Sequence, residues 1–166
     1  MNDGNLTDRI IEEARKVGLD HLMTRNRAQK GIQTFRERFS TLSNWKKQLG
    51  ITALRQRYIT THFGRKIPFT KGEYSAPCYW AQGTEVELML HLIIALGAKL
   101  KADFPETHIK MFLHDELILE TPKEDAHAVA ELLRTAMEKV FIWRFPQAPL
   151  INLLDIHINE CWGNLK

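Results

Sequence analysis

The stretch Phe112-Leu113-His114-Asp115-Glu116-Leu117-Ile118-Leu119-Glu120-Thr121-Pro122 decides how the second half of this chain folds. β-prone runs at residues 109–114 and 117–121 flank Asp115 and Glu116, which predicts two antiparallel strands joined by a tight turn at this acidic pair. Strands on both sides would hold the two carboxylates in place, and Mg²⁺ prefers oxygen ligands of this kind. A polar turn without any ligand is the alternative, and the local sequence taken alone favours it.

Helices are expected on both sides of this hairpin. Residues 84–102 are apolar nearly all the way round, which is typical of a helix in the centre of a fold. Pro122 stands where a further helix should begin, and that helix is expected to run to about residue 140. Residues 150–158 are expected to form a final strand. This order predicts an α+β fold in which a small antiparallel sheet packs against several helices.

The first half of the chain also predicts helices. A helical stretch at residues 6–17 should end at Gly18, and Thr24 should cap the next helix. Residues 53–63 pass from helix-like to strand-like composition, and residues 64–78 predict turn and loop. Behind Thr24, apolar residues recur at spacings of three and four and predict one helix that ends at Gly50; they are Ala28, Ile32, Phe35, Phe39, Leu42, Trp45 and Leu49.

The net charge of +3 conceals an uneven distribution. Residues 1–70 hold 14 basic residues (Lys and Arg) and 6 acidic ones (Asp and Glu). Residues 71–166 hold 9 basic and 14 acidic residues. Between Arg25 and Lys66 there are 11 basic residues and one acid, Glu37. Such a block suits a phosphate backbone, because each cation that replaces a condensed counterion adds affinity. A solvated helix face is the alternative, and charge alone does not decide between the two.

Two short motifs add further candidates. Gln82-Gly83-Thr84 precedes the apolar helix, so Thr84 is expected to cap that helix and Gly83 to allow a backbone to come close. Phe63-Gly64-Arg65-Lys66 places two cations after a glycine, which suits contact with phosphate. An ordinary helix start and a turn with solvated charges are the alternatives.

Several functional classes find no support in the sequence. There is no run of about 18 apolar residues for a membrane helix, and residues 1–5 do not predict a secretory signal. Cys78 and Cys161 stand far apart, so a zinc framework is absent and a reduced cytoplasmic protein is expected. Neither a Gly-x-Ser-x-Gly nucleophile motif nor a Gly-x-x-x-x-Gly-Lys phosphate loop is present.

Taken in order, the motifs resemble the C-terminal part of the family A, DNA polymerase I-like, DNA polymerases. The resemblance runs from about Arg15 to Asn164, and its most specific match is residues 112–122, which resemble the family's motif C. The other matches are residues 23–45 (the segment after the nucleotide-binding helix), 58–66 (a glycine-arginine-arginine turn), 82–85 (a glutamine-glycine-threonine motif) and, loosely, 159–164 (the closing motif).

The resemblance implies a palm-like fold and a role for individual residues. Asp115 would bind catalytic Mg²⁺, Glu116 would support the same metal site, and His114 would lie near the primer terminus. The chemistry would be phosphoryl transfer, in which metal ions stabilise the attacking 3′-oxygen and the leaving pyrophosphate. Contacts to the primer-template duplex are expected from Gln82, Arg57, Arg65 and Lys66.

Parts of the family pattern are missing. The second metal-binding aspartate, in an Asp-Tyr-Ser-like strand, does not occur, and residues 27–35 do not reproduce the four-residue spacing of the nucleotide-binding helix. Cys78 and Tyr74 stand where the family usually has an asparagine and an arginine that contact DNA, and the loop at residues 67–77 is shortened.

We therefore expect a polymerase fragment or subunit with a helical, basic segment at residues 1–70 and a palm segment at residues 71–166. It would supply one half of a two-metal site and need an upstream part with the second aspartate and the dNTP-binding helix, and a partner chain is expected to supply that part. Without that part, it should not polymerise. A non-catalytic nucleic-acid-binding module and a small metal-dependent nuclease that uses Asp115 and Glu116 are the alternatives.

Overall fold

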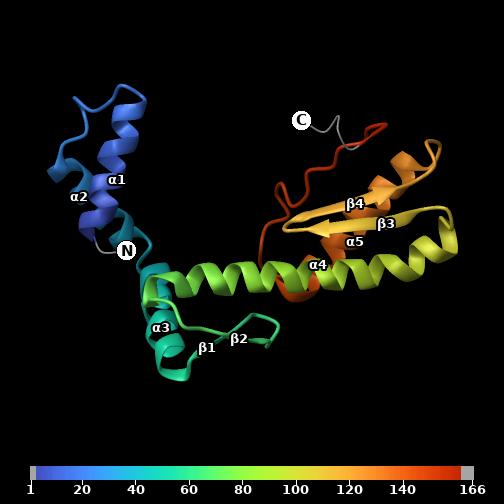
Figure 1. The fold of residues 1–166 in the computed structure, drawn as a ribbon, viewed down its shortest axis with the longest axis horizontal. Helices are drawn as coiled ribbons and strands as arrows, with labels where there is room; N and C mark the ends of the chain where they lie inside the picture. Colours follow the sequence, from blue (N-terminus) through green and yellow to red (C-terminus); the bar gives the residue numbers. More distant parts are fainter. Residues whose placement is uncertain (1–2, 162–166) are drawn as a thin grey trace. The chain divides into compact units, whose positions relative to one another are not determined.

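The structure is a computed structural model that describes residues 3–161. Trp162, Gly163 and Asn164 of the expected closing motif lie outside these residues, as do Met1 and Asn2. Packing divides the chain into two compact units, residues 1–81 and 82–166. This division falls within a helix, whereas the net charge of the sequence changes from positive to negative at about residue 70. The elements in chain order (Figure 1) are α1 (Asp3–Lys16), α2 (Arg25–Arg38), α3 (Ser40–Gln56), β1 (Tyr58–Thr60), β2 (Lys66–Pro68), the 3₁₀ turn η1 (Glu73–Ser75), α4 (Ala76–Asp103), β3 (His108–Leu113), β4 (Glu116–Glu120) and α5 (Ala126–Arg144).

The helix ends near the N-terminus follow the local sequence. After α1, Gly18 has a φ of +74°, and the backbone N–H of Leu19 donates to the carbonyl of Ala14 at 2.8 Å. At the start of α2, the Thr24 hydroxyl accepts a hydrogen bond from the backbone N–H of Arg27 at 3.3 Å. Both capping predictions are confirmed, because a left-handed glycine and a threonine oxygen satisfy backbone groups that a helix end leaves unpaired.

The expected single helix from Thr24 to Gly50 is wrong. The chain leaves helical geometry at Phe39, where φ is −111° and ψ is 47°, so that α2 and α3 are separate. The hydroxyl of Ser43 donates to the carbonyl of Arg36 at 3.4 Å across this break. Serine and threonine hydroxyls compete for backbone hydrogen bonds, so Ser40, Thr41 and Ser43 favour an interruption of the helix here.

Gly50 lies inside α3 instead of ending it. The helix continues to Gln56 and ends at Arg57, whose φ is +63°. Gly50 is buried because the chain around Glu73 packs directly on it: a Cβ added at Gly50 would lie 2.8 Å from the carbonyl oxygen of Glu73. The glycine is therefore needed for a close approach between α3 and η1.

We expect Gly50→Ala to destabilise the fold by about 1–3 kcal/mol, the usual cost of forcing extra atoms into a packed site. Gly31→Ala in α2 is the matched control, because a Cβ there meets nothing within 4 Å. Alanine should stabilise that position by about 0.5–1 kcal/mol through its higher helix propensity. Urea unfolding measures both values. Equal effects of the two substitutions would show that the contact with Glu73 is unimportant.

The core of the first unit lies under the β1–β2 hairpin. Ile59 on β1 pairs with Ile67 on β2, and Phe69 follows directly after β2. Phe69 and Ile59 are 0% and 1% exposed, and they form one buried cluster with Ala53 and Ala76. Burial of these side chains holds the end of α3, the hairpin and the start of α4 together.

Helix α4 begins at Ala76, eight residues before the expected start at residue 84. Ala76 is fully buried in the cluster described above, and Pro77 occupies the first turn, where its missing N–H is tolerated. Thr84 therefore lies inside the helix and does not cap it, and Gly83 is likewise helical. The expectation of a helix start at Gln82-Gly83-Thr84 is wrong, because core packing of residues further upstream extends the helix.

Residues 84–102 are not buried all round. Leu92 and Leu96 are 0% and 1% exposed, whereas Leu90 and Ile94 are 44% and 72% exposed. The helix thus buries one stripe, which also includes Leu88, Met89 and Leu100. The apolar composition alone could not distinguish burial on one side from burial on all sides.

The second unit contains the predicted hairpin and the predicted helix, but the predicted final strand is wrong. Strands β3 and β4 form a two-stranded antiparallel sheet, and α5 follows as expected. Residues 153–159 have no regular structure. A strand needs the backbone groups of a neighbouring edge, and in the described part of the chain neither β3 nor β4 pairs with this segment.

No helix of the described residues is both long and apolar enough to span a bilayer. The described cysteines, Cys78 and Cys161, are free and exposed.

Candidate functional site

The acidic pair lies at the tip of the β3–β4 hairpin. Leu113 pairs with Glu116, so the two-residue turn consists of His114 and Asp115, one position earlier than expected. His114, Asp115 and Glu116 are all exposed. The carboxylates are therefore open to solvent and to a ligand instead of being buried in the core.

The turn uses a backbone conformation that is uncommon for a side chain larger than glycine. His114 has a φ of +56°, in the left-handed region. Two-residue hairpins need positive φ in the turn because only that twist matches the strands, and histidine is among the residues that tolerate it. The tight turn holds residues 114–116 at a defined point on the hairpin.

Contacts further down the hairpin stabilise its base. The hydroxyls of Thr107 and Thr121 lie 2.8 Å apart in a hydrogen bond, and Thr107 is 6% exposed. A register shift between Ile109 and Met111 leaves Lys110 as the extra residue of a β-bulge. Two strands held at the base can present a turn with little freedom at the other end.

Lys110 forms an ion pair with Glu120 across the hairpin. A hydrogen bond from Lys110 and its positive charge lower the pKa of the Glu120 carboxyl below its usual value. Since the folded-state pKa is lowered, the pair stabilises the hairpin above the unfolded-state pKa, and this contribution is lost as the pH falls through the folded-state value. Both side chains are exposed, so salt screens the interaction.

Asp115 and Glu116 suit one part of a magnesium site. Magnesium in proteins is typically held by one or two carboxylates together with waters and substrate phosphates. Adjacent exposed carboxylates on a tight turn match that description. Among residues 3–161, no group of three or more His, Cys, Asp and Glu is arranged to hold a metal ion.

The predicted DNA-contacting cations lie on the β1–β2 hairpin of the first unit. Arg65 is in the connecting turn and Lys66 begins β2, where the Lys66 ammonium lies 4.8 Å from the centre of the Tyr58 ring. The Thr61 hydroxyl accepts a hydrogen bond from the backbone N–H of Arg65 at 3.1 Å and shapes this turn. Arg57 stands at the other end of the hairpin, where its carbonyl accepts from the N–H of Phe69.

Gln82 is an exposed residue of α4 and belongs to the second unit, with the acidic hairpin. The structure thus places the expected metal ligands and Gln82 in one unit, and Arg57, Arg65 and Lys66 in the other.

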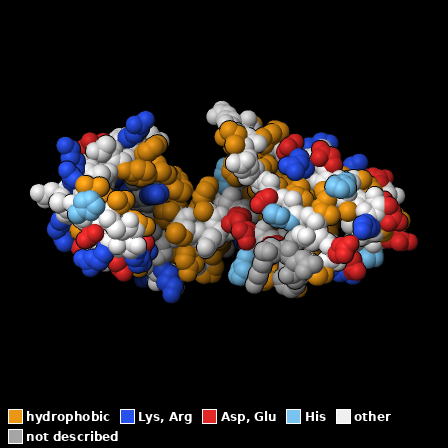
Figure 2. Space-filling model, turned by 90° about the horizontal axis from the view of Figure 1, so that it is seen from above, with side chains coloured by type: hydrophobic (Ala, Val, Ile, Leu, Met, Phe, Trp, Pro, Cys, Tyr) orange, Lys and Arg blue, Asp and Glu red, His pale blue; other side chains and the backbone are white. Residues whose placement is uncertain are grey.

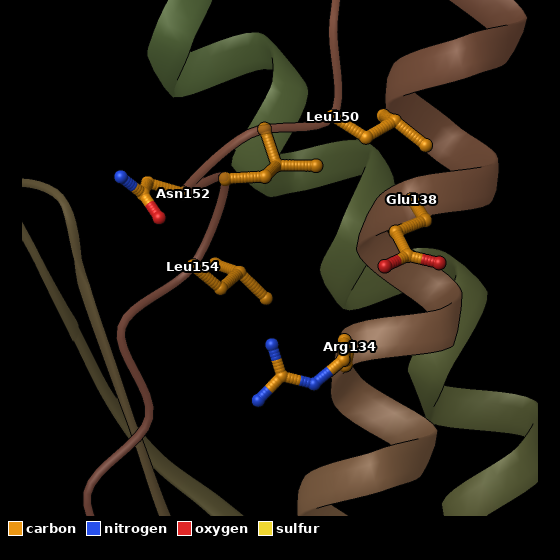
Figure 3. Close-up of a pocket in the computed structure, with 6 residues that line it drawn as sticks. Arg134, Glu138, Leu150, Asn152 and Leu154 are labelled. Atoms are coloured by element: carbon orange, nitrogen blue, oxygen red, sulfur yellow. The ribbon is translucent and has the colours of Figure 1, made fainter.

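A small pocket lies between α5 and residues 150–154 (Figure 3). Arg134 and Glu138 come from α5, and Leu150, Asn152 and Leu154 come from the segment that follows it. Its volume is about 120 Å³, whereas pockets for small-molecule ligands usually measure about 300 Å³ or more. The pocket does not include His114, Asp115 or Glu116, and it is too small for a nucleotide.

A second hollow lies where α2 meets α3, and the sequence did not reveal it. It is an open groove of about 530 Å³. The sequence predicted one apolar stripe along a continuous helix, and the structure leaves Phe35 and Phe39 of that stripe 52% and 45% exposed. The run of serine and threonine after Phe39 was the signal that could have indicated the break. The groove is lined by Arg38, Phe39, Ser40, Thr41, Leu42 and Trp45.

The surface of the first unit combines cations with exposed apolar side chains. Figure 2 shows blue Lys and Arg side chains gathered over α1 and α2, with orange side chains exposed among them. Residues 1–81 hold 15 Lys and Arg and 7 Asp and Glu, so the surface potential of this unit favours anionic partners.

Comparison with known proteins gives a consistent result. A profile of the family described as DNA polymerase family A matches residues 13–164. DNA polymerase I of Bacillus caldotenax is 25% identical over 155 residues, which cover 87% of this chain and 17% of that protein. The thermostable DNA polymerase I of Thermus aquaticus is 30% identical over 152 residues, which cover 84% of this chain and 17% of that protein.

A solved structure shares the fold. The POL domain of Pol1 from M. smegmatis, in complex with DNA primer-template and dNTP, superposes with a TM-score of 0.62 and 16% sequence identity. The match covers 81% of this chain and 27% of that one. The chain thus spans about a sixth of the curated relatives and about a quarter of the solved domain.

Proposed function

Because this chain belongs to DNA polymerase family A, we propose that it supplies the motif C half of a two-metal nucleotidyl-transfer site. The observation that carries the proposal is the exposed pair Asp115 and Glu116 on the β3–β4 turn, inside the segment that matches the family. The primer-template duplex and dNTP are the proposed ligands, in keeping with the molecules bound to the solved relative.

The proposed roles follow from the hairpin. Asp115 would contribute a carboxylate oxygen to magnesium, and Glu116 would add negative charge beside it. Magnesium, when bound, would neutralise the charge that develops on the attacking and leaving oxygens during phosphoryl transfer. His114 would lie next to the primer end because it shares the two-residue turn with Asp115. Gln82, Arg57, Arg65 and Lys66 would contact the duplex, chiefly through phosphate and groove positions.

The proposed ligands Asp115 and Glu116 would form only part of such a site. Two-metal catalysis needs further oxygen ligands, and no third acidic, histidine or cysteine ligand joins Asp115 and Glu116 among residues 3–161. We therefore propose that an upstream part of the polymerase supplies the second aspartate and the dNTP-binding helix. The same lack of neighbouring acids in the described residues gives no support to an independent nuclease.

Primer extension tests this proposal. The purified chain should incorporate no nucleotide on a primed template with Mg²⁺, because its ligand set is incomplete. Extension should appear when a separate chain is added that carries an Asp-Tyr-Ser-like strand and the Arg/Lys/Phe/Tyr helix. The added chain alone is the control. Efficient extension by the purified chain without any addition would refute the proposal.

A non-catalytic nucleic-acid-binding module is the second candidate, and the cations from Arg25 to Lys66 favour it. The two candidates differ at Asp115. In a module without catalysis, Asp115→Ala would leave DNA binding intact and there would be no extension activity to lose. In a polymerase subunit, the same substitution would reduce extension by the complemented enzyme about 10³-fold.

A further inference from the structure

We infer that the groove between α2 and α3 binds single-stranded nucleic acid, with unpaired bases stacked on its aromatic side chains. This inference rests on the proposed function and adds to it, because the expected duplex contacts lie on other residues. Three features carry it: exposed rings, cations beside them, and the absence of acids from the described residues that line the groove.

Phe39 and Trp45 line the groove, and the ring of Phe35 lies beside that of Phe39. Phe35 and Phe39 are one helical turn apart, and their ring centres lie 4.8 Å from each other. Trp45 borders the groove, is 37% exposed, and is held by an edge contact with Trp80 at 5.2 Å. Base faces stack on exposed aromatic rings with any sequence, and each such contact contributes about 1–3 kcal/mol.

Arg38 lines the groove, and Lys46 lies on α3 next to the lining residue Trp45. Arg38 is three residues after Phe35, and Lys46 is four residues after Leu42, which are neighbouring positions on a helix surface. Within the described chain, no acid forms an ion pair with Arg38 or Lys46, so both charges face solvent. A strand whose bases lie in the groove would therefore find cations for its phosphates.

The one acid in this part of the sequence points elsewhere. Glu37 is two residues from both Phe35 and Phe39, and residues two apart lie on different faces of a helix. Its carboxylate accepts a hydrogen bond from Gln33 at 2.8 Å. The groove is consequently apolar at its centre and cationic at its border, which complements a polyanion with planar bases.

Unpaired strands fit this surface better than duplex. In a duplex, each base is already stacked between its neighbours, so its faces cannot reach a protein ring. A protein partner would use the same apolar residues, but lysine is depleted at protein interfaces and single-strand grooves combine cations with rings. The charge pattern therefore favours nucleic acid as the occupant.

Fluorescence anisotropy with labelled oligothymidylate and with a duplex of equal length tests the inference on the full chain. The key variant is Phe35→Leu combined with Phe39→Leu, which keeps apolar bulk and removes the rings. We expect it to bind oligothymidylate about tenfold more weakly or worse, since each lost stack is worth about 1–3 kcal/mol. Its duplex affinity should change by less than about twofold. Tyr74→Leu, at an exposed ring outside the groove, should bind as the parent chain does.

Two further variants keep the test decisive if the leucine variant folds poorly. Trp45→Phe keeps an aromatic face, so it should still bind the oligonucleotide while the ligand-induced quenching of tryptophan fluorescence decreases. Arg38→Gln combined with Lys46→Gln should make the dependence of log K on log salt shallower by about 1.4, because two phosphate contacts are removed.

The inference is overturned if a folded leucine variant binds oligothymidylate as tightly as the parent, or if it loses duplex affinity by the same factor as oligothymidylate affinity. Unchanged oligonucleotide binding together with lost association of the complementing polymerase chain would identify the groove as a protein contact. Asp115→Ala should leave oligonucleotide binding unchanged, so failure at the groove is separable from failure of the catalytic proposal.

Discussion

Replacing Asp115 with alanine will reduce primer extension by the complemented enzyme about 10³-fold, the scale of losing a major electrostatic stabiliser of a transition state. The carboxylate stands exposed in the β3–β4 turn, so its removal takes away a proposed metal ligand without opening a cavity. Single-turnover extension of a labelled primer at saturating dNTP measures the effect. Unfolding curves of the variant should match those of the parent chain.

Two matched substitutions make this result specific. Glu124→Ala removes another exposed acid of the same unit, outside the hairpin, and should leave the rate within about twofold, the small effect usual for a surface site. Glu116→Gln should reduce the rate less than Asp115→Ala, because its proposed role supports the metal ligand. If Asp115→Ala extends primers at the parent rate, the hairpin is not part of the catalytic site.

Phe69→Ala will produce the largest loss of stability, about 3–5 kcal/mol, as is usual for truncating a buried aromatic side chain. Phe69 is fully buried in the cluster with Ala53, Ile59 and Ala76, and its ring lies 5.4 Å from that of Tyr79. The variant would leave a cavity at the point where the hairpin, α3 and α4 meet. Urea unfolding followed by tryptophan fluorescence measures the loss.

Phe35→Ala is the control for this prediction. It removes the same atoms from a ring that is 52% exposed, so the expected loss is about 1 kcal/mol or less. Phe69→Leu should fall between the two, because it retains part of the buried volume. Equal losses at residues 35 and 69 would contradict the position of the core described for the first unit.

Features that depend on a few neighbouring residues could be predicted from the sequence. The left-handed Gly18, the Thr24 cap and the acidic hairpin are examples, because backbone sterics and local hydrogen bonds decide them within a turn or two. The turn at residues 114 and 115 was misplaced by one position, since several pairing registers satisfy the same alternation. The family motifs around Asp115 were recognisable because they too are contiguous in the chain.

Contacts between distant segments decided the rest. Burial of Ala76 beside Phe69 extends α4 upstream of Gln82, and the approach of Glu73 requires a glycine at position 50 inside a helix. Residues 153–159 alternate like a strand but have no paired edge among the described residues.

The sequence by itself thus determined the helical and strand periods, the caps, the charge of each segment and the acidic pair on its turn. Only the tertiary structure decided which apolar faces are buried: it covers Leu92 and Leu96 and leaves Ile94, Phe35 and Phe39 exposed. Periodicity shows that a face is apolar, but burial depends on whether another segment packs against that face, and this is a property of the whole fold.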